Sequence, residues 1–360
     1  MNFGWLNKGT RLQDHLQNDH QNNFTLIRLI AALIVVKQHS FSATAPNSKD
    51  ALMSVLHLSA LGLPSFFFIS GLLVSQSLEL SSSWKNFLWK RFLRLYPAAC
   101  LSILFCAFIL GPLVTTWNIK DYFSSHIFYQ FLSTCFLIQV KYQLPGVFDN
   151  SLIGHSSVNS SLWTVCLELK LYLGLLFFWL LKIPGKKYFL FLFILLFFIA
   201  GQVFPNETDA AIYKLTNRHI NIFGEFTCTL VFLTGVLANM YKQKITIKNS
   251  WLLFILIYFI LSIYFSNLLL HLFLFIFIPA VNLFVATKGI SLLKKITPKP
   301  DLSYGIYVFA FPLQQIVANY LRPTNTWTFF LLTVLMVLPF AFFSWYVVEK
   351  KALSLKRLVR

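Results

Sequence analysis

The chain has 360 residues, of which 57% are hydrophobic and 18% aromatic, while only 12% are charged, and its mean hydropathy is +0.67. A soluble domain of this size cannot bury so much apolar surface, so the composition excludes an ordinary soluble protein. The net charge of +18 would suit a nucleic-acid-binding protein, but the positions of the basic residues explain it as membrane topology. The five cysteines show no CxxC spacing and no pairing with His, so we predict no metal site.

Long apolar runs predict an all-α, polytopic integral membrane protein with about ten transmembrane helices. The first 23 residues are polar, so we expect no cleaved signal peptide. A further apolar segment, 126–139, is too short to span comfortably and could be re-entrant, interfacial or a packed loop helix. The predicted spans are 24–44, 57–78, 92–114, 162–181, 188–204, 222–240, 251–265, 267–287, 303–320 and 327–348.

The basic residues give these spans a direction. An even number of spans puts both termini on one side of the membrane. Most of the 30 Lys and Arg residues then fall in the terminal segments and in the loops on that same side, which the positive-inside rule assigns to the cytoplasm. We therefore expect a polar cytoplasmic segment 1–23, a transmembrane domain 24–349 and a basic cytoplasmic tail 350–360, with both termini cytoplasmic.

The first span carries three ionisable residues within the sequence FTLIRLIAALIVVKQHS: Arg28, Lys37 and His39. Such residues are costly inside a membrane and usually mark a functional site. Arg28 and His39 are eleven residues apart, which returns them to within about 20° of one helix face, about 16 Å apart along the axis. The topology places Arg28 in the cytoplasmic half and His39 in the outer third. Lys37 points elsewhere, and we interpret it as a snorkelling side chain.

The fourth span carries Glu168 and Lys170 in SLWTVCLELKLYLG, at a predicted depth similar to that of His39. A carboxylate beside an imidazole can fix its tautomer and stabilise the imidazolium, which supports a His general base. The alternative is that Glu168 pairs with a cation for purely structural reasons. Tyr172, one turn later, could line the same cavity or simply pack, and the role of Lys170 stays open.

A basic cluster precedes the third predicted span in WKNFLWKRFLRLYP, and we expect Pro97 to end it as a unit. Paired guanidinium donors suit a phosphorylated ligand. The alternative is that the cluster only sets topology or contacts anionic lipid headgroups. Arg28 favours the ligand, because it lies inside the membrane where headgroups cannot reach it. The cluster contains Lys85, Lys90, Arg91 and Arg94.

Two other positions have competing explanations. Gly71, in FFFISGLLVSQSL, could admit a ligand or another backbone, or could serve ordinary small-residue helix packing. Glu349 closes the tenth predicted span, and we expect it to be an interfacial anchor, the alternative being a functional role.

Six stretches, in this order along the chain, resemble motifs of the membrane acyltransferase-3 family of bacterial O-acyltransferases. RLIAALIVVKQHS resembles the Arg-to-His first helix, FFFISGLLVSQSL the FFxxSGxL second helix, and WKRFLRLYP the RRxxRxxP stretch. SLWTVCLELKLY resembles the LWxLxxExxxY motif, and SYGIYVFAFPLQQ with WYVVEKKAL resembles the C-terminal signature. The functional positions of the family then fall on Arg28, His39, Arg91, Arg94, Glu168 and Tyr172.

The chain departs from the family pattern at several places. Ala310 stands where many members have His, so we expect no second catalytic His there. Thr164, Val165 and Cys166 replace residues that are often Ser or Leu-like. We also expect no fused extracytoplasmic hydrolase-like domain, so transfer would be completed by the membrane domain or handed to a separate protein.

The resemblance implies an acyltransferase domain in the bacterial cytoplasmic (inner) membrane. It would move an acyl group, most often acetyl from acetyl-CoA, to a hydroxyl of a cell-envelope sugar such as O-antigen, capsule or exopolysaccharide. His39 would act as general base or accept the acyl group covalently, and Glu168 would orient or charge-balance it. Acyl-CoA would be bound by Arg28, Arg91, Arg94 and Tyr172. The expected partners are acyl-CoA, an envelope glycan or lipid-linked sugar, and the lipid bilayer, with no nucleic acid; the oligomeric state stays open.

Two other classes of protein fit the residues. A transporter or flippase for lipid-linked sugars would also carry intramembrane Arg, His and Glu. A structural or assembly subunit would tolerate the loss of His39 and Glu168. Replacing His39 by Ala separates the classes, since an enzyme would lose acylated product while a flippase would lose surface glycan.

Overall fold

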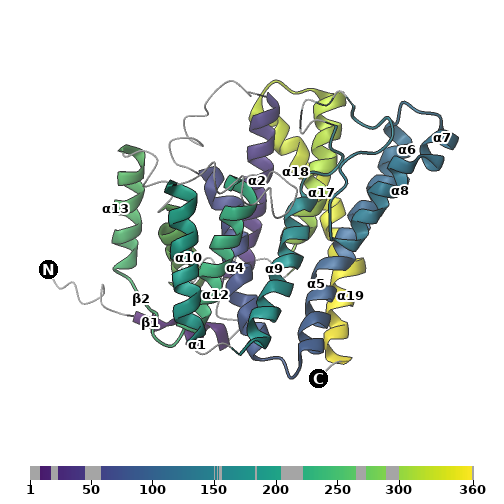
Figure 1. Ribbon diagram of the computed structural model, residues 1–360. Helices are drawn as coiled ribbons and strands as arrows, with labels where there is room; N and C mark the ends of the chain where they lie inside the picture. The colour runs from purple at the N-terminus through teal and green to yellow at the C-terminus, as the bar shows by residue number, and fades with distance from the viewer. Residues whose placement is uncertain are drawn as a thin grey trace. The chain divides into compact units, whose positions relative to one another are not determined.

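The computed structural model of the chain describes residues 9–17, 23–44, 58–149, 151, 153, 156–182, 185–203, 222–264, 273–288 and 300–358. The chain divides into two compact units, and both are built almost entirely of helices (Figure 1). Helices α2 and α9 each contribute to both. Unit 1 comprises Met1–Ala31, Ala51–Leu80 and Gly174–Lys299; unit 2 comprises Ala32–Asp50, Ser81–Leu173 and Pro300–Arg360.

Within the described ranges, five helices are long and apolar enough to cross a membrane by length and composition. The prediction of an all-α, multi-pass membrane protein is therefore confirmed, while the number of ten spans and the cytoplasmic side of the termini stay predictions. Part of the predicted span 267–287 lies outside the described residues. The five helices are Phe24–Thr44, Leu61–Glu79, Trp84–Val114, Leu162–Leu180 and Thr326–Arg357.

Unit 1 is a group of helices with one small sheet at one end (Figure 1). One-turn π-helical segments, Ile222–Phe226 and Phe273–Phe277, lead into α12 and α15. The elements of unit 1 are β1 (Gly9–Arg11), α1 (Leu12–Gln17), the first part of α2 (Phe24–Thr44), α4 (Leu58–Glu79), the last part of α9 (Leu162–Leu180), α10 (Lys186–Val203), α12 (Thr227–Met240), β2 (Thr246–Lys248), α13 (Trp251–Tyr264) and α15 (Ile278–Lys288).

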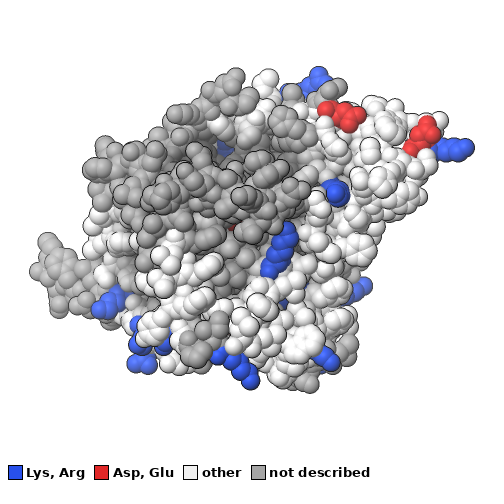
Figure 2. Space-filling view, viewed as in Figure 1, with Lys and Arg blue, Asp and Glu red and all other residues white. Residues whose placement is uncertain are grey.

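Residues 9–17 of the polar N-terminal segment form a strand and a short helix. β1 pairs antiparallel with β2, with Gly9 opposite Lys248, and the Leu12 amide donates to the Ile245 carbonyl at 3.0 Å. Leu12 and Leu16 are buried in the same apolar cluster as Phe68 of α4. The strand pairing places the segment before α2 at the same end of unit 1 as the loop between α12 and α13, where Figure 2 shows basic side chains.

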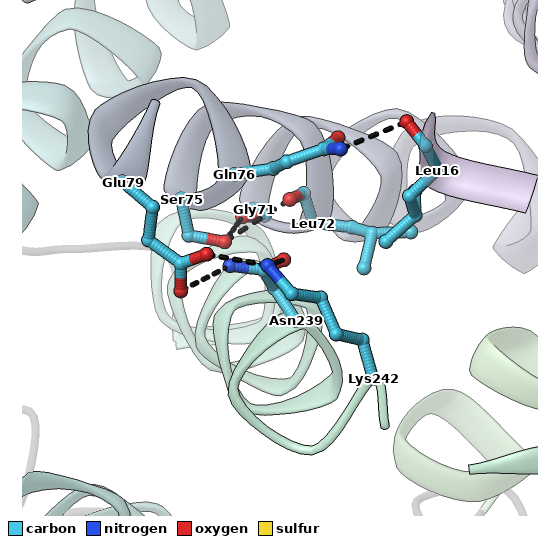
Figure 3. Close-up of polar contacts among 8 residues, drawn as sticks. All are labelled: Leu16, Gly71, Leu72, Ser75, Gln76, Glu79, Asn239 and Lys242. Atoms are coloured by element: carbon cyan, nitrogen blue, oxygen red, sulfur yellow. Dashed lines mark hydrogen bonds and ion pairs between the residues drawn. The ribbon is translucent and has the colours of Figure 1, made fainter. Parts of the chain in front are cut away.

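Helices α4 and α12 pack with their backbones in close contact. A Cβ added at Gly71 of α4 would overlap the Phe232 carbonyl of α12, and one added at Gly235 would overlap the Phe68 carbonyl. Gly71 therefore serves small-residue helix packing, one of the two functions predicted for it. Figure 3 shows the polar end of this pair, where the Glu79 carboxylate accepts from the Asn239 amide at 2.9 Å and pairs with the Lys242 ammonium at 2.5 Å.

Unit 2 contains most of the ionisable residues singled out from the sequence. A π-helical turn, Cys106–Leu110, joins α5 to α6, and two others, Val317–Leu321 and Ser344–Glu349, extend α17 and α18. The elements of unit 2 are the rest of α2, α5 (Trp84–Phe105), α6 (Gly111–Val114), α7 (Ile119–Ser124), α8 (His126–Leu132), a 3₁₀ turn (Ser133–Phe136), the first part of α9, α17 (Ser303–Ile316), α18 (Thr326–Phe343), α19 (Lys350–Ser354) and a second 3₁₀ turn (Leu355–Leu358).

Helix α5 begins eight residues before the predicted span, and this corrects the view of the basic cluster. The Ser83 hydroxyl accepts from the Asn86 amide at 3.2 Å, which caps the first turn at Trp84. Pro97 lies inside the helix and does not end the cluster. Arg91 and Arg94 are therefore carried by the body of α5 rather than by a loop before it.

The segment 126–139, too short to span, runs back along α5. The Tyr122 hydroxyl donates to the Ala107 carbonyl at 2.7 Å, and the Tyr96 hydroxyl donates to the Phe136 carbonyl at 3.0 Å. Ala107 and Tyr96 are eleven residues apart, about 16 Å along the helix. The chain then returns, and the Thr116 amide donates to the Gly146 carbonyl at 3.0 Å. The segment is therefore a helix packed on α5, and whether it is re-entrant or interfacial in the membrane stays a prediction.

The predicted tail continues the last helix. The described chain is helical to Leu358, and the Trp89 indole at the start of α5 donates to the Leu355 carbonyl at 3.4 Å. On the face shown in Figure 2, basic side chains lie at this end of unit 2, where α5 begins and α19 ends, and one of the two acidic patches lies at α7.

Candidate functional site

The C-terminal half of α2 lies against α17 and α18, and His39 contacts α17. The His39 ring meets the Phe311 ring edge-on, with centroids 5.3 Å apart. The Thr44 and Thr326 hydroxyls are 2.7 Å apart. Across the part of the chain that the structure describes, no hydrogen bond joins His39 to Glu168, so the predicted support of the imidazole by this carboxylate stays a prediction.

Lys37 is buried rather than snorkelling, so our interpretation of it is wrong. Its side chain is 5% exposed, and its ammonium lies 4.3 Å from the centroid of the Trp327 ring on α18. A cation over an indole face is stabilised by the ring quadrupole. This contact gives Lys37 a structural role. Lys170 is exposed on α9, and nothing in the structure assigns it a function.

Arg94 forms an ion pair that the sequence did not reveal. Its Nη2 lies 3.0 Å from Asp301 Oδ2, and the Ser303 hydroxyl donates to the other carboxylate oxygen at 2.5 Å. Asp301 lies two residues before α17, so the pair joins the start of α17 to the middle of α5. The Arg94 guanidinium also lies 5.6 Å from the Tyr304 ring centroid.

Glu168, Tyr172 and Arg91 form the neighbouring group. The Tyr172 hydroxyl donates to a Glu168 oxygen, one turn apart on α9. The Arg91 guanidinium lies 5.8 Å from the Tyr172 ring centroid and interacts electrostatically with Tyr172. Glu168 is close enough to interact electrostatically with both Arg91 and Arg94. The structure thus brings together four of the six predicted site residues.

Glu349 is a member of this charged group, and the prediction that it is an interfacial anchor is wrong. It is 3% exposed, accepts a hydrogen bond of 2.8 Å from the Ser344 hydroxyl, and interacts electrostatically with Arg94 and Asp301. The group therefore combines two guanidinium groups, Arg91 and Arg94, with the carboxyls of Glu168, Asp301 and Glu349. Carboxyl groups thus surround the two arginines of what the sequence predicted as a basic cluster.

Arg28 lies on the part of α2 that belongs to unit 1. Its Nε donates to the Phe24 carbonyl one turn earlier at 3.4 Å. The helix is continuous from Phe24 to Thr44, so the predicted spacing of Arg28 and His39 on one helix face is retained. Its role in ligand binding stays a prediction.

Within unit 2, a buried hydrogen-bond network ties the loop before α9 to α5 and α17. The Asn159 amide donates to the Val308 carbonyl at 2.9 Å and to the Ser102 hydroxyl at 3.1 Å. Gln315, on α17, donates to the carbonyls of Ile153 at 2.9 Å and Ser157 at 2.5 Å. These partners are 57 to 162 residues apart, so no local motif in the sequence could have identified them.

The class of protein follows from these observations: a multi-pass helical membrane protein with a buried ionisable group inside one helical unit. Comparison with known proteins then gives the family. Residues 21–346 match the family model of the acyltransferase-3 domain, described as an acyltransferase domain. The chain belongs to this family and is an acyltransferase enzyme.

Two relatives are informative. The chain is 28% identical over 343 residues to an O-acetyl transferase of Shigella phage Sf6, covering 93% of this chain and 97% of the relative. It is 31% identical over 162 residues to nodulation protein 10 of Rhizobium leguminosarum bv. viciae, covering 43% of each chain. No solved structure gives a significant match.

Proposed function

We propose that the protein is an O-acetyltransferase of the bacterial cytoplasmic membrane, with about ten spans and both termini cytoplasmic. It moves an acetyl group from acetyl-CoA to a hydroxyl of a cell-envelope polysaccharide such as O-antigen, capsule or exopolysaccharide. The observation that carries the proposal is the family match over 21–346, supported by the O-acetyl transferase similar to nearly the whole chain.

His39 is the proposed catalytic base. The hydroxyl oxygen of the sugar attacks the thioester carbonyl, the carbon–sulfur bond breaks, and the hydroxyl proton passes through the imidazole to the departing CoA thiolate. An acetyl group carried briefly by His39 would give the same products. Phe311 sets the tilt of the ring in either route, because it contacts the imidazole edge-on.

The donor is proposed to enter through the charged group of α5 and α9. Because two guanidinium groups face three carboxyls there, a multiply charged phosphate would meet repulsion as well as attraction. The N–H groups of Arg91 and Arg94 and the Tyr172 hydroxyl suit the amide carbonyls of a pantetheine arm. The phosphates are proposed to bind toward Lys85 and Lys90, at the start of α5. The binding of acyl-CoA by Arg28 stays a prediction from the sequence.

Glu168 is proposed to keep Arg91 and Tyr172 in place for the donor. Its carboxylate accepts the Tyr172 hydroxyl and faces Arg91, which fits this function more directly than support of His39. Glu168→Gln is expected to raise KM for acetyl-CoA. If it instead leaves KM unchanged and displaces the pH profile of kcat, the carboxylate acts on the base.

The proposal is tested by replacing His39 with Ala, with His126→Ala as the matched control. His126 is exposed on α8 and is a histidine of the same membrane protein, outside the charged group. We expect NMR of the envelope polysaccharide to show acetyl esters in the wild type and in His126→Ala, and none in His39→Ala, with equal amounts of surface glycan in all three. Loss of surface glycan in His39→Ala would indicate a flippase. Full acetylation in His39→Ala would show that the catalytic assignment is wrong.

A further inference from the structure

The small sheet of unit 1 has one buried face and one exposed face. Side chains alternate between the two faces of a strand, so Thr10 and Ile247 point one way and their neighbours the other. Ile247 is fully buried, in the apolar cluster that also contains Leu12. The residues on the other side are all exposed, and we call them the basic strand face: Gly9, Arg11, Thr246 and Lys248.

The chain around the basic strand face carries an excess of positive charge. Residues 9–17 and 241–250 contain four basic residues and one acidic residue, Asp14, which gives the two stretches a net charge of +3 with histidine neutral. Lys242 is paired with Glu79 of α4. Figure 2 shows basic side chains over this end of unit 1. Because like charges repel, an anionic partner would stabilise the three other cations, which are exposed: Arg11, Lys244 and Lys248.

Helix α13 places the edge of the lipid close to this face. β2 ends at Lys248 and α13 begins at Trp251, three residues later (Figure 1). Three residues span at most about 10 Å, which is comparable to the thickness of a headgroup layer. The exposed side chains of α13 are apolar and cover about 200° of the helix, as expected for a helix in contact with lipid. They are Leu252, Leu253, Phe254, Leu256, Ile257 and Ile260.

Helix α10 marks the same boundary. The Lys187 ammonium, in the first turn of α10, lies 5.5 Å from the centroid of the Tyr241 ring, which lies between α12 and β2. The exposed side chains that follow Lys187 on α10 are apolar or aromatic. Two helices with lipid-facing residues therefore begin at the end of unit 1 that carries the basic strand face. The exposed residues of α10 include Tyr188, Phe189, Phe191, Leu192 and Phe193.

We propose that the basic strand face binds the anionic headgroups of phospholipids, in the leaflet at this end of unit 1. Each cation beside an anionic leaflet contributes about fivefold to binding. The polar segment before α2 is then held on the membrane surface through Arg11, in addition to its pairing with β2. This inference goes beyond the proposed function and does not depend on it. In the proposed topology, the leaflet is the cytoplasmic one.

Lipid headgroups fit this face better than the phosphates of a soluble donor. The face is exposed and lies beside the start of two lipid-facing helices, where headgroups are already present. Arg91 and Arg94, which are proposed to bind the donor, belong to unit 2. The donor therefore does not need the basic strand face.

The test measures amide hydrogen exchange of residues 9–17 in the full-length protein. The protein is placed in nanodiscs of phosphatidylcholine alone, or of phosphatidylcholine and phosphatidylglycerol in equal parts. The Leu12 amide donates to the Ile245 carbonyl at 3.0 Å and the Gln13 amide to the Lys242 carbonyl at 3.2 Å, so the exchange of these two amides reports the separation of β1 from β2.

Phosphatidylglycerol should slow this exchange about fivefold, because separation takes one cation, Arg11, away from the headgroups. High salt should remove most of the difference. Arg11→Gln should exchange at the same rate in both kinds of nanodisc, and Arg11→Lys should retain the difference. The matched control is Arg322→Gln, since Arg322 is also exposed but belongs to unit 2, and this variant should respond to phosphatidylglycerol as the wild type does.

Three results would overturn the inference. One is equal exchange of the wild-type protein in the two kinds of nanodisc, which decides the matter even if Arg11→Gln fails to accumulate. Another is a full response to phosphatidylglycerol in Arg11→Gln. The third is slower exchange of the same amides when acetyl-CoA is added to nanodiscs of phosphatidylcholine alone, which would show that the face binds a soluble phosphate ligand.

Discussion

Replacing Arg94 with Met is expected to destabilise unit 2 more than replacing Asp301 with Asn. The two side chains are 19% and 12% exposed, and their charged atoms are 3.0 Å apart. At an effective dielectric constant of about 20, two unit charges at this separation attract by roughly 5 kcal/mol, much of which is offset by their desolvation. Removing one partner of a buried pair typically costs about 3–5 kcal/mol, because the other charge stays buried without compensation.

The asymmetry comes from Glu349. It interacts electrostatically with both Arg94 and Asp301. Asp301→Asn leaves the guanidinium with another carboxyl nearby, so its cost should fall at or below the low end of that range. Arg94→Met leaves two carboxyls facing each other without the cation between them, so its cost should fall at the high end.

The measurement is denaturant unfolding of the full-length protein in detergent micelles, for both single variants and the double variant. The double variant should cost less than the sum of the two by about 1–3 kcal/mol, as for residues in one network. Strictly additive costs, or a larger cost for Asp301→Asn than for Arg94→Met, would refute the reasoning.

Two predictions concern unit 1. Gly71→Ala should reduce the yield of folded protein on size-exclusion chromatography, because the new Cβ would overlap the Phe232 carbonyl. Gly174→Ala is the control and should be tolerated, since a Cβ there has no neighbour within 4 Å. Equal yields of the two variants would contradict the close approach of α4 and α12. Glu79→Gln should lower the free energy of unfolding by less than about 1 kcal/mol, because Glu79 is 41% exposed in its pair with Lys242. The loss should be smaller still in high salt. A large, salt-independent loss would show that the pair is structurally essential.

The sequence predicted features that depend on local pattern and missed those that depend on distant partners. Helix α2 was predicted with the bounds that the structure shows, because a long apolar run fixes a helix by itself. The start of α5 was placed too late, because Ser83 forms a cap that hydropathy does not register. Glu349 was assigned to the membrane interface because it ends an apolar run. That position in the sequence does not indicate that the Arg94 guanidinium and the Asp301 carboxyl lie near it.

The candidate site shows the same division. The resemblance identified Arg91, Arg94, Glu168 and Tyr172, and the structure brings these four together. It did not identify Asp301, which lies 207 residues from its partner Arg94. Pairings of this kind follow from how α5, α9 and α17 pack, which one sequence does not specify.

The Arg94–Asp301 pair also decides how a loss of activity at Arg94 should be interpreted. An arginine needed to hold α5 against α17 would abolish transfer when replaced even if it never contacted the donor. Asp301→Asn separates the two roles, because it frees the guanidinium without removing it. If Arg94 binds the donor, Asp301→Asn should keep or lower KM for acetyl-CoA despite its lower stability. If Arg94 is purely structural, both variants should lose activity in proportion to their loss of folded protein, with KM unchanged.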